Sequence, residues 1–116
     1  MLERHGERFL LRVFTKAEKE YAMSGANSAE KLAGRFAVKE AMIKALGAGK
    51  SAGITWQDIE TVPNSSGKPV VRLRNQAIRY LKWKGGSANA VHVSIAHDGG
   101  KAIAFAVVEQ GVEENK

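Results

Sequence analysis

Cysteine is absent from this sequence of 116 residues. Its absence excludes disulfides, thiolate metal sites and cysteine nucleophiles, and it fits a reducing cytoplasm, where we expect the protein to reside. Long hydrophobic runs are also missing. The apolar stretch 102–108 is too short to cross a membrane, and Met1–His5 leads into no signal-peptide core. Internal repeats and low-complexity tracts do not occur. We therefore expect no membrane partner.

The chain does contain enough apolar residues for a core, and it has an excess of positive charge. Hydrophobic residues make up 44% of it, which predicts one folded domain over residues 1–110 and a frayed tail over 111–116. The net charge of +6 favours anionic partners: nucleic acid, acidic proteins or phosphorylated small molecules. Trp56, Tyr80 and Trp83 could stack on bases, but no nucleic-acid-binding motif accompanies them, so we expect no nucleic acid partner.

Three helices are predicted in the first half. Residues 1–12 have the pattern of the end of a helix. Thr15 followed by Glu18 is a capping box that starts a second helix, ending near Gly25. Asn27, with an acidic residue three positions later, gives a second capping signal for a long helix over residues 28–46.

Strands and one short helix are predicted in the second half. Asn75 can cap a helix that stops at Gly85. The predicted strands, each bounded by turn residues, are 54–62, 70–73, 90–96 and 102–109. The order of elements predicts an α+β domain: a mostly antiparallel sheet with helices packed on one face.

The long helix carries an unusual group of charges. Arg35 and Lys39 stack on one side, and Glu40 and Lys44 stack about 100° around from them. A carboxylate among cations suits a divalent metal that holds a phosphate group. The alternatives from spacing alone are a surface pair between Glu40 and Lys44, and a solvated basic face for Arg35 and Lys39.

Several motifs then match one family in order along the chain. They are Arg8-Phe9 with Arg12, Phe14-Thr15-Lys16-Ala17-Glu18, residues 32–41 with Lys44-Ala45-Leu46-Gly47, Trp56-Gln57-Asp58-Ile59-Glu60, Gly67-Lys68-Pro69 and His92-Val93-Ser94-Ile95-Ala96-His97. The chain resembles the holo-acyl-carrier-protein synthases, which are small bacterial 4′-phosphopantetheinyl transferases. The resemblance implies transfer of the phosphopantetheine arm of coenzyme A to a serine of apo-acyl carrier protein. It also implies Mg²⁺ dependence, a role in fatty acid and lipid biosynthesis, and a homotrimer with active sites at subunit interfaces.

One departure concerns the metal. The family begins with a strand whose aspartate is a metal ligand, and no residue of this sequence maps onto it. Either the sequence starts late at an internal Met1, which we favour, or it is a variant with an impaired metal site. A non-catalytic binder of coenzyme A or carrier protein is therefore the alternative function.

The resemblance assigns roles to the residues of the long helix and of the last hairpin. Glu40 is expected to ligate Mg²⁺ and Lys44 to stabilise the departing bisphosphate. Arg35, Lys39, Gly47 and His97 are expected to contact coenzyme A. For Gly47, a loop that ends the helix is an equally good explanation.

A basic ridge on the first helix is the expected docking surface for the carrier protein. Arg4, Arg8 and Arg12 recur every four residues, and Phe9 supplies an apolar anchor beside them. Acyl carrier proteins are strongly acidic, so such a surface would speed their encounter with the enzyme. An ordinary solvated helix face is the alternative.

Overall fold

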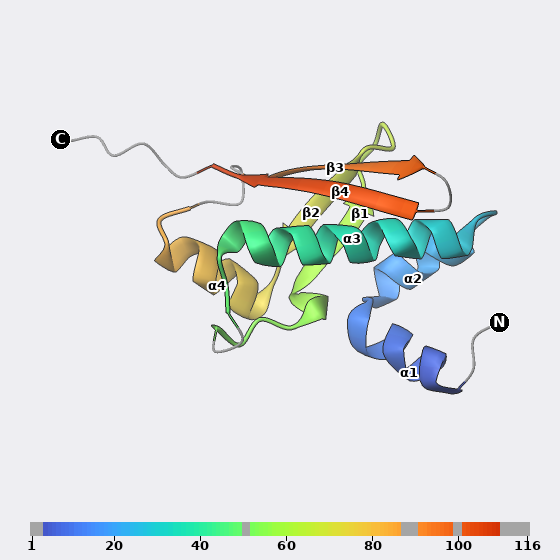
Figure 1. The fold of residues 1–116 in the computed structure, drawn as a ribbon, viewed down its shortest axis with the longest axis horizontal. Helices are drawn as coiled ribbons and strands as arrows, with labels where there is room; N and C mark the ends of the chain where they lie inside the picture. The colour runs from blue at the N-terminus through green and yellow to red at the C-terminus, as the bar shows by residue number, and fades with distance from the viewer. Residues whose placement is uncertain (1–3, 50–51, 87–90, 99–100, 110–116) are drawn as a thin grey trace.

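The computed structural model describes residues 4–49, 52–86, 91–98 and 101–109. One long helix lies along the last hairpin, and the first hairpin crosses behind both (Figure 1). In chain order the elements are α1 (Arg4–Val13), α2 (Lys16–Met23), α3 (Ser28–Leu46), the 3₁₀ helix η2 (Trp56–Asp58), β1 (Ile59–Pro63), β2 (Pro69–Leu73), α4 (Asn75–Trp83), β3 (Val91–Asp98) and β4 (Lys101–Val108). None of the helices within these ranges is both long and apolar enough to cross a membrane.

The strands form two antiparallel hairpins. Strand β1 pairs with β2, and β3 pairs with β4 in a register that sets Ser94 opposite Phe105. The β3–β4 hairpin lies along α3, and the labelled helices all lie on the same side of it (Figure 1). The predicted α+β class is confirmed. Strand β3 continues to Asp98, which pairs with Lys101, so it extends two residues beyond its predicted end at residue 96.

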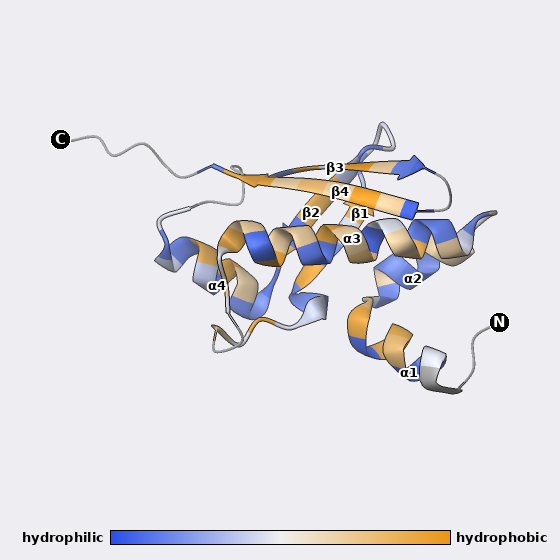
Figure 2. Ribbon diagram, viewed as in Figure 1, coloured by the Kyte–Doolittle hydropathy of each residue, from blue (hydrophilic) through white to orange (hydrophobic). Residues whose placement is uncertain are grey.

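The core is built on the buried side of α3. Figure 2 shows hydrophobic colour along most of β4, which packs on this helix. Alternate residues of β3 and β4 face inward, as the period of two in a strand requires. The fully buried centre of the core consists of Val38, Met42, Leu46, Ile59, Ala77 and Leu81.

The predicted starts of α2 and α3 are right in position, although the side-chain cap expected of Asn27 does not form, and the cap predicted for α4 is wrong by one residue. The capping box at α2 is confirmed, since Thr15 Oγ1 accepts from Glu18 N at 3.2 Å and Glu18 Oε1 accepts from Thr15 N at 3.0 Å. Asn27 precedes α3 but is left-handed (φ 64°), and its side chain makes no capping hydrogen bond. Asn75 is the first residue of α4 rather than its cap, which is Arg74.

The strand expected over residues 54–62 is also shorter than predicted. It begins only at Ile59, because Trp56–Asp58 forms a 3₁₀ turn. Asp58 stabilises this turn twice: its carboxylate accepts from Thr55 N at 3.0 Å, and its own N–H donates to the carbonyl of Thr55 at 3.0 Å. A local hydrogen-bonded turn thus replaces extended backbone despite β-branched neighbours.

Candidate functional site

Arg35 is buried, and no anionic side chain of the described residues pairs with it. Only 6% of it is exposed, and its guanidinium carbon lies 4.1 Å from the centroid of the Tyr21 ring. Within the described residues no carboxylate lies within 4.0 Å of it, and its Nε has no hydrogen-bond partner. Burial lowers the pKa of Arg35, although Tyr21 and Glu18 oppose the shift. A buried cation with an unused donor is a candidate contact for an anionic ligand.

Arg35 lines a cavity of about 390 Å³, and Lys68 and His97 line it as well. The residues that line the cavity come from α2, α3, β3, the start of β2 and the turn that joins β1 to β2. Its other lining residues are Tyr21, Gly67, Pro69, Val93, Ser94 and Ile95. Arg35 and His97 around one space suit a phosphate group, and the exposed Lys68 at its edge adds positive charge. The structure therefore brings together two of the predicted coenzyme A contacts, Arg35 and His97.

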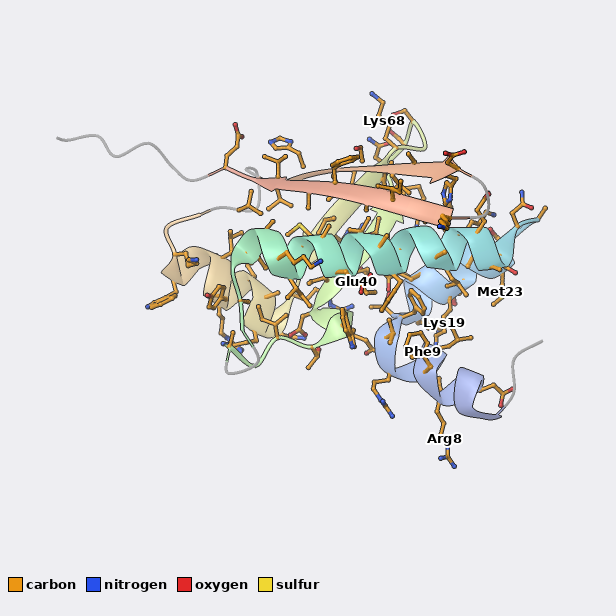
Figure 3. All side chains as sticks on the ribbon, viewed as in Figure 1. Arg8, Phe9, Lys19, Met23, Glu40 and Lys68 are labelled. Atoms are coloured by element: carbon orange, nitrogen blue, oxygen red, sulfur yellow. The ribbon has the colours of Figure 1, made fainter. Side chains whose placement is uncertain are left out.

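Lys68 was not among the predicted site residues. It lies directly before β2, where its backbone carbonyl accepts from Asn64 N at 2.8 Å and closes the β1–β2 turn, and Figure 3 shows its side chain pointing away from the helices. The signal was in the sequence, because Gly67-Lys68-Pro69 is one of the motifs that carry the resemblance. What could not be read there was that this turn reaches the same cavity as Arg35 and His97.

Gly34 explains how β3 reaches this cavity. A Cβ atom added to Gly34 would lie 3.2 Å from Ile95 Cγ2 and 3.3 Å from His97 Cε1, closer than side chains normally pack. The absent side chain lets the strand approach the helix. His97 therefore contacts α3 at Gly34, the residue directly before Arg35.

Glu40 and Lys44 lie on the exposed side of α3. Both are solvent-exposed, and the described residues contain no ion pair between them or with any other group within 4.0 Å. The surface pair is thus not formed. With 100° per residue, Glu40 points about 140° around the helix from Arg35. One copy of the chain does not bring these two residues into the same cavity.

The carboxylate of Glu40 fits Mg²⁺ only as a single protein ligand. No cluster of three or more His, Asp or Glu side chains that could hold a metal occurs in the described residues. Mg²⁺ is often bound through one or two carboxylates, with water and substrate phosphate completing its coordination. An exposed, unpaired carboxylate meets that requirement.

The expectation that Lys39 contacts a phosphate is not supported by its surroundings. Its side chain is fully buried, with Nζ 2.9 Å from Glu18 Oε1. Burial lowers the pKa of Lys39, and the Glu18 carboxylate opposes the shift. The helical period placed Arg35 and Lys39 on one side correctly, but that side faces the interior, so neither lies on a solvated basic face.

Gly47 ends α3 in the left-handed conformation, at φ 69°. Its N–H donates to the carbonyls of Ile43 and Lys44, and its own carbonyl accepts from the Tyr80 hydroxyl at 3.3 Å. These contacts are those of a helix end. Gly47 lies twelve residues beyond Arg35, about 18 Å along the helix, so it does not share the Arg35 cavity. Its contact with coenzyme A stays a prediction.

The basic ridge is present on α1 where its side chains are described. Arg8 and Arg12 are exposed, and Arg8 extends away from the molecule in Figure 3. The side chain of Arg4, the third predicted member, lies outside the described residues. Arg12 also borders an apolar cavity of about 570 Å³ next to Trp56.

The apolar anchor of the ridge is larger than the sequence indicated. Phe9 is 44% exposed, and its ring packs edge-on against Phe36, with centroids 5.7 Å apart. Phe36 in turn packs on Trp56, at 5.3 Å. Three aromatic rings from α1, α3 and η2 thus form one partly exposed surface beside Arg8 and Arg12.

Comparison with known proteins gives consistent results. A model described as the 4′-phosphopantetheinyl transferase superfamily matches residues 1–106. A holo-[acyl-carrier-protein] synthase of Methylobacterium radiotolerans is 46% identical over 110 residues, covering 93% of this chain and 81% of that protein. The crystal structure of such a synthase from Neisseria meningitidis matches with a TM-score of 0.80 at 28% identity, over 90% of this chain and 82% of that one. Another, from Bacillus anthracis in complex with coenzyme A (3′,5′-ADP), matches with a TM-score of 0.70 at 32% identity, over 95% and 87%.

Proposed function

Because the chain belongs to the 4′-phosphopantetheinyl transferase superfamily, we propose that it transfers the 4′-phosphopantetheine arm of coenzyme A to a serine of apo-acyl carrier protein. The second product is adenosine 3′,5′-bisphosphate. The observation that carries the proposal is Arg35, a buried cation without an anionic partner in the described residues, in a cavity shared with Lys68 and His97. Coenzyme A has both a diphosphate and a 3′-phosphate, and either is an anion that a buried arginine can bind.

The reaction exchanges one phosphorus–oxygen bond for another. The serine oxygen attacks the phosphorus atom next to pantetheine, the bond to the bisphosphate breaks, and the serine proton passes to a base. Lys44, exposed one turn beyond Glu40, would stabilise charge on the departing bisphosphate. Mg²⁺ bound by Glu40 would neutralise the diphosphate. Arg35, Lys68 and His97 would hold the nucleotide and orient it.

We also propose that the site is shared between copies of the chain in a homotrimer. Arg35 and Glu40 face different sides of α3, so a ligand that touches both sets of residues needs two subunits. The outer face of the β3–β4 hairpin supports this assembly, because three large apolar side chains are exposed there: Ile103 at 49%, Phe105 at 65% and Val107 at 55%. An exposed apolar face of this kind marks an interaction surface.

The docking ridge supports the choice of an acidic carrier protein. Arg8 and Arg12 offer positive charge, and the Phe9–Phe36–Trp56 surface offers an apolar contact next to it. Charge complementarity raises the rate of encounter, while the aromatic rings contribute to affinity. We assign the reaction to the cytoplasm and to fatty acid and lipid biosynthesis, in keeping with an acyl carrier protein as substrate.

The test is substitution of Glu40. Glu40→Gln keeps the shape of the side chain but removes the charge that binds a cation, and it should abolish Mg²⁺-dependent transfer. Transfer is followed as the mass increase of apo-acyl carrier protein in the presence of coenzyme A. Glu30→Gln, an exposed acidic residue in the first turn of the same helix, is the matched control and should keep wild-type turnover.

Near-normal turnover by Glu40→Gln would refute the role of this residue. Calorimetry separates the alternative function. If the chain binds coenzyme A with equal affinity with and without Mg²⁺ and transfers nothing, it is a non-catalytic binder.

A further inference from the structure

The ion pair between Lys39 and Glu18 is a charged cluster that the proposed chemistry does not use. Both side chains are fully buried. Besides Glu18 Oε1 at 2.9 Å, Lys39 Nζ donates to the backbone carbonyls of Trp56, at 2.9 Å, and Ile59. An ammonium has three N–H donors, and three acceptors use all of them. Lys39 therefore has no donor left for a substrate.

Glu18 is equally committed to the protein. Its Oε1 accepts from Thr15 N at 3.0 Å, and its Oε2 accepts from Thr61 N at 2.8 Å. The cluster joins α2, α3 and β1 at one buried point. Such a point fixes these elements relative to one another, since any displacement leaves a buried charge unpaired.

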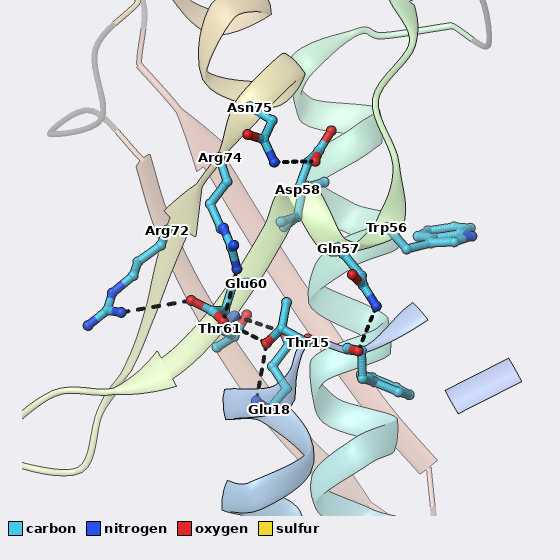
Figure 4. A network of polar contacts seen from close by, with 12 residues as sticks. Thr15, Glu18, Trp56, Gln57, Asp58, Glu60, Thr61, Arg72, Arg74 and Asn75 are labelled. Atoms are coloured by element: carbon cyan, nitrogen blue, oxygen red, sulfur yellow. Dashed lines mark hydrogen bonds and ion pairs between the residues drawn. The ribbon is translucent and has the colours of Figure 1, made fainter. Parts of the chain in front are cut away.

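The segment that accepts from Lys39 also holds the end of α1. Gln57 Nε2 donates to the carbonyls of Leu11, at 2.6 Å, and Phe14, at 3.0 Å. Thr15 Oγ1 donates to Glu60 Oε2 at 2.6 Å (Figure 4). Residues 56–61 thus bind the α1–α2 corner, and Lys39 binds residues 56–61 to α3.

We infer that Lys39 and Glu18 are positioning residues, an inference that rests on the proposed function. They set the distance between the docking ridge on α1 and Glu40, which follows Lys39 directly on α3. A carrier protein held on the ridge must present its serine to the diphosphate near Glu40. A misplacement of about 1 Å can lower a rate about 100-fold, so a rigid connection between the two surfaces matters to transfer.

The test compares the single variant Lys39→Met with the double variant Glu18→Gln/Lys39→Met. The single variant leaves Glu18 buried and unpaired and can fail to fold, whereas the double variant leaves no unpaired charge, and its glutamine oxygen still accepts from Thr15 or Thr61. The matched control is Lys16→Met/Glu20→Gln, which makes the same chemical change at an exposed pair of α2 with a 4.0 Å contact.

The kinetic measurement separates positioning from stability. For double-variant protein shown to be folded by circular dichroism, kcat should fall about 10- to 100-fold, while the dissociation constant of coenzyme A stays within about threefold of wild type. The control should retain its kcat. A lower melting temperature with an unchanged kcat would show a merely structural pair and overturn the inference.

A distance measurement tests the inference independently of activity. Because the chain has no cysteine, spin labels at Leu11→Cys on α1 and Ala33→Cys on α3 report the separation of these helices directly. The distance distribution should broaden or shift in the double variant and not in the control. An unchanged distribution overturns the inference even if the chain is inactive, whereas absence of transfer by the wild-type chain would refute the proposed function instead.

Discussion

At the scale of single residues, burial decides which cations on α3 can meet a ligand. Arg35 and Lys39 are one turn apart and both almost inaccessible. Lys39 has three protein acceptors, whereas Arg35 Nε has no acceptor among the described residues. The helical period could predict that they share a side. It could not predict the carboxylate opposite Lys39, because Glu18 lies 21 positions earlier in the chain. Long-range pairing of this kind is what a single sequence leaves open.

Arg35→Met should weaken coenzyme A binding with little loss of stability. The substitution removes charge-assisted hydrogen bonds to phosphate, which predicts an affinity lower by about 10- to 100-fold. No ion pair is lost within the described residues, so the free energy of unfolding should fall by no more than the contact with the Tyr21 ring contributes, about 1–2 kcal/mol. Calorimetry and urea denaturation measure the two effects, and a large loss of stability with unchanged affinity would contradict the assignment.

At the scale of elements, local signals were reliable where the hydrogen bonds are local. The Thr15–Glu18 box and the left-handed Gly47 at the end of α3 both formed, because each involves residues within one turn. The strand predicted over residues 54–58 did not form, because another local hydrogen bond, from Thr55 N to the carboxylate of Asp58, closes a turn there. The approach of β3 to Gly34 depends on residues some sixty positions apart, and only the folded chain reveals it.

Thr15→Ala should destabilise the protein more than loss of an ordinary cap does. Its hydroxyl caps α2 and also donates to Glu60, which is buried. Loss of the cap costs about 1 kcal/mol, and an unpaired buried carboxylate oxygen adds to it, so we expect about 2–3 kcal/mol in urea denaturation. Thr15→Ser keeps the hydroxyl, so its free energy of unfolding should fall by less than half as much as that of Thr15→Ala. An equal fall in both variants would exclude the hydroxyl as the cause.

At the scale of the whole molecule, charge and apolar surface lie in different places. The ridge on α1 is positively charged, whereas the outer face of the β3–β4 hairpin is apolar. The net charge and the apolar composition were readable from the sequence, but their separation onto two surfaces required the fold. We expect the first surface to receive the carrier protein and the second to receive further copies of the chain.

Reversing the charge of the ridge should affect one substrate only. Arg8→Glu/Arg12→Glu should raise the KM for carrier protein and remove its dependence on salt, because the attraction between opposite charges is lost. The dissociation constant of coenzyme A should stay close to that of wild type. Steady-state kinetics at two ionic strengths provide the measurement, and an equal effect on both substrates would rule out the ridge as the docking surface.

The β3–β4 hairpin has one further consequence. Alternate residues of β4 pack on α3, while Ile103, Phe105 and Val107 have no covering layer within the described residues. If identical chains supply that layer, dilution removes it, and the melting temperature should fall as protein concentration is lowered. Phe105→Lys should abolish this concentration dependence. The hairpin would thus make the lifetime of each folded copy depend on how many others the cell produces.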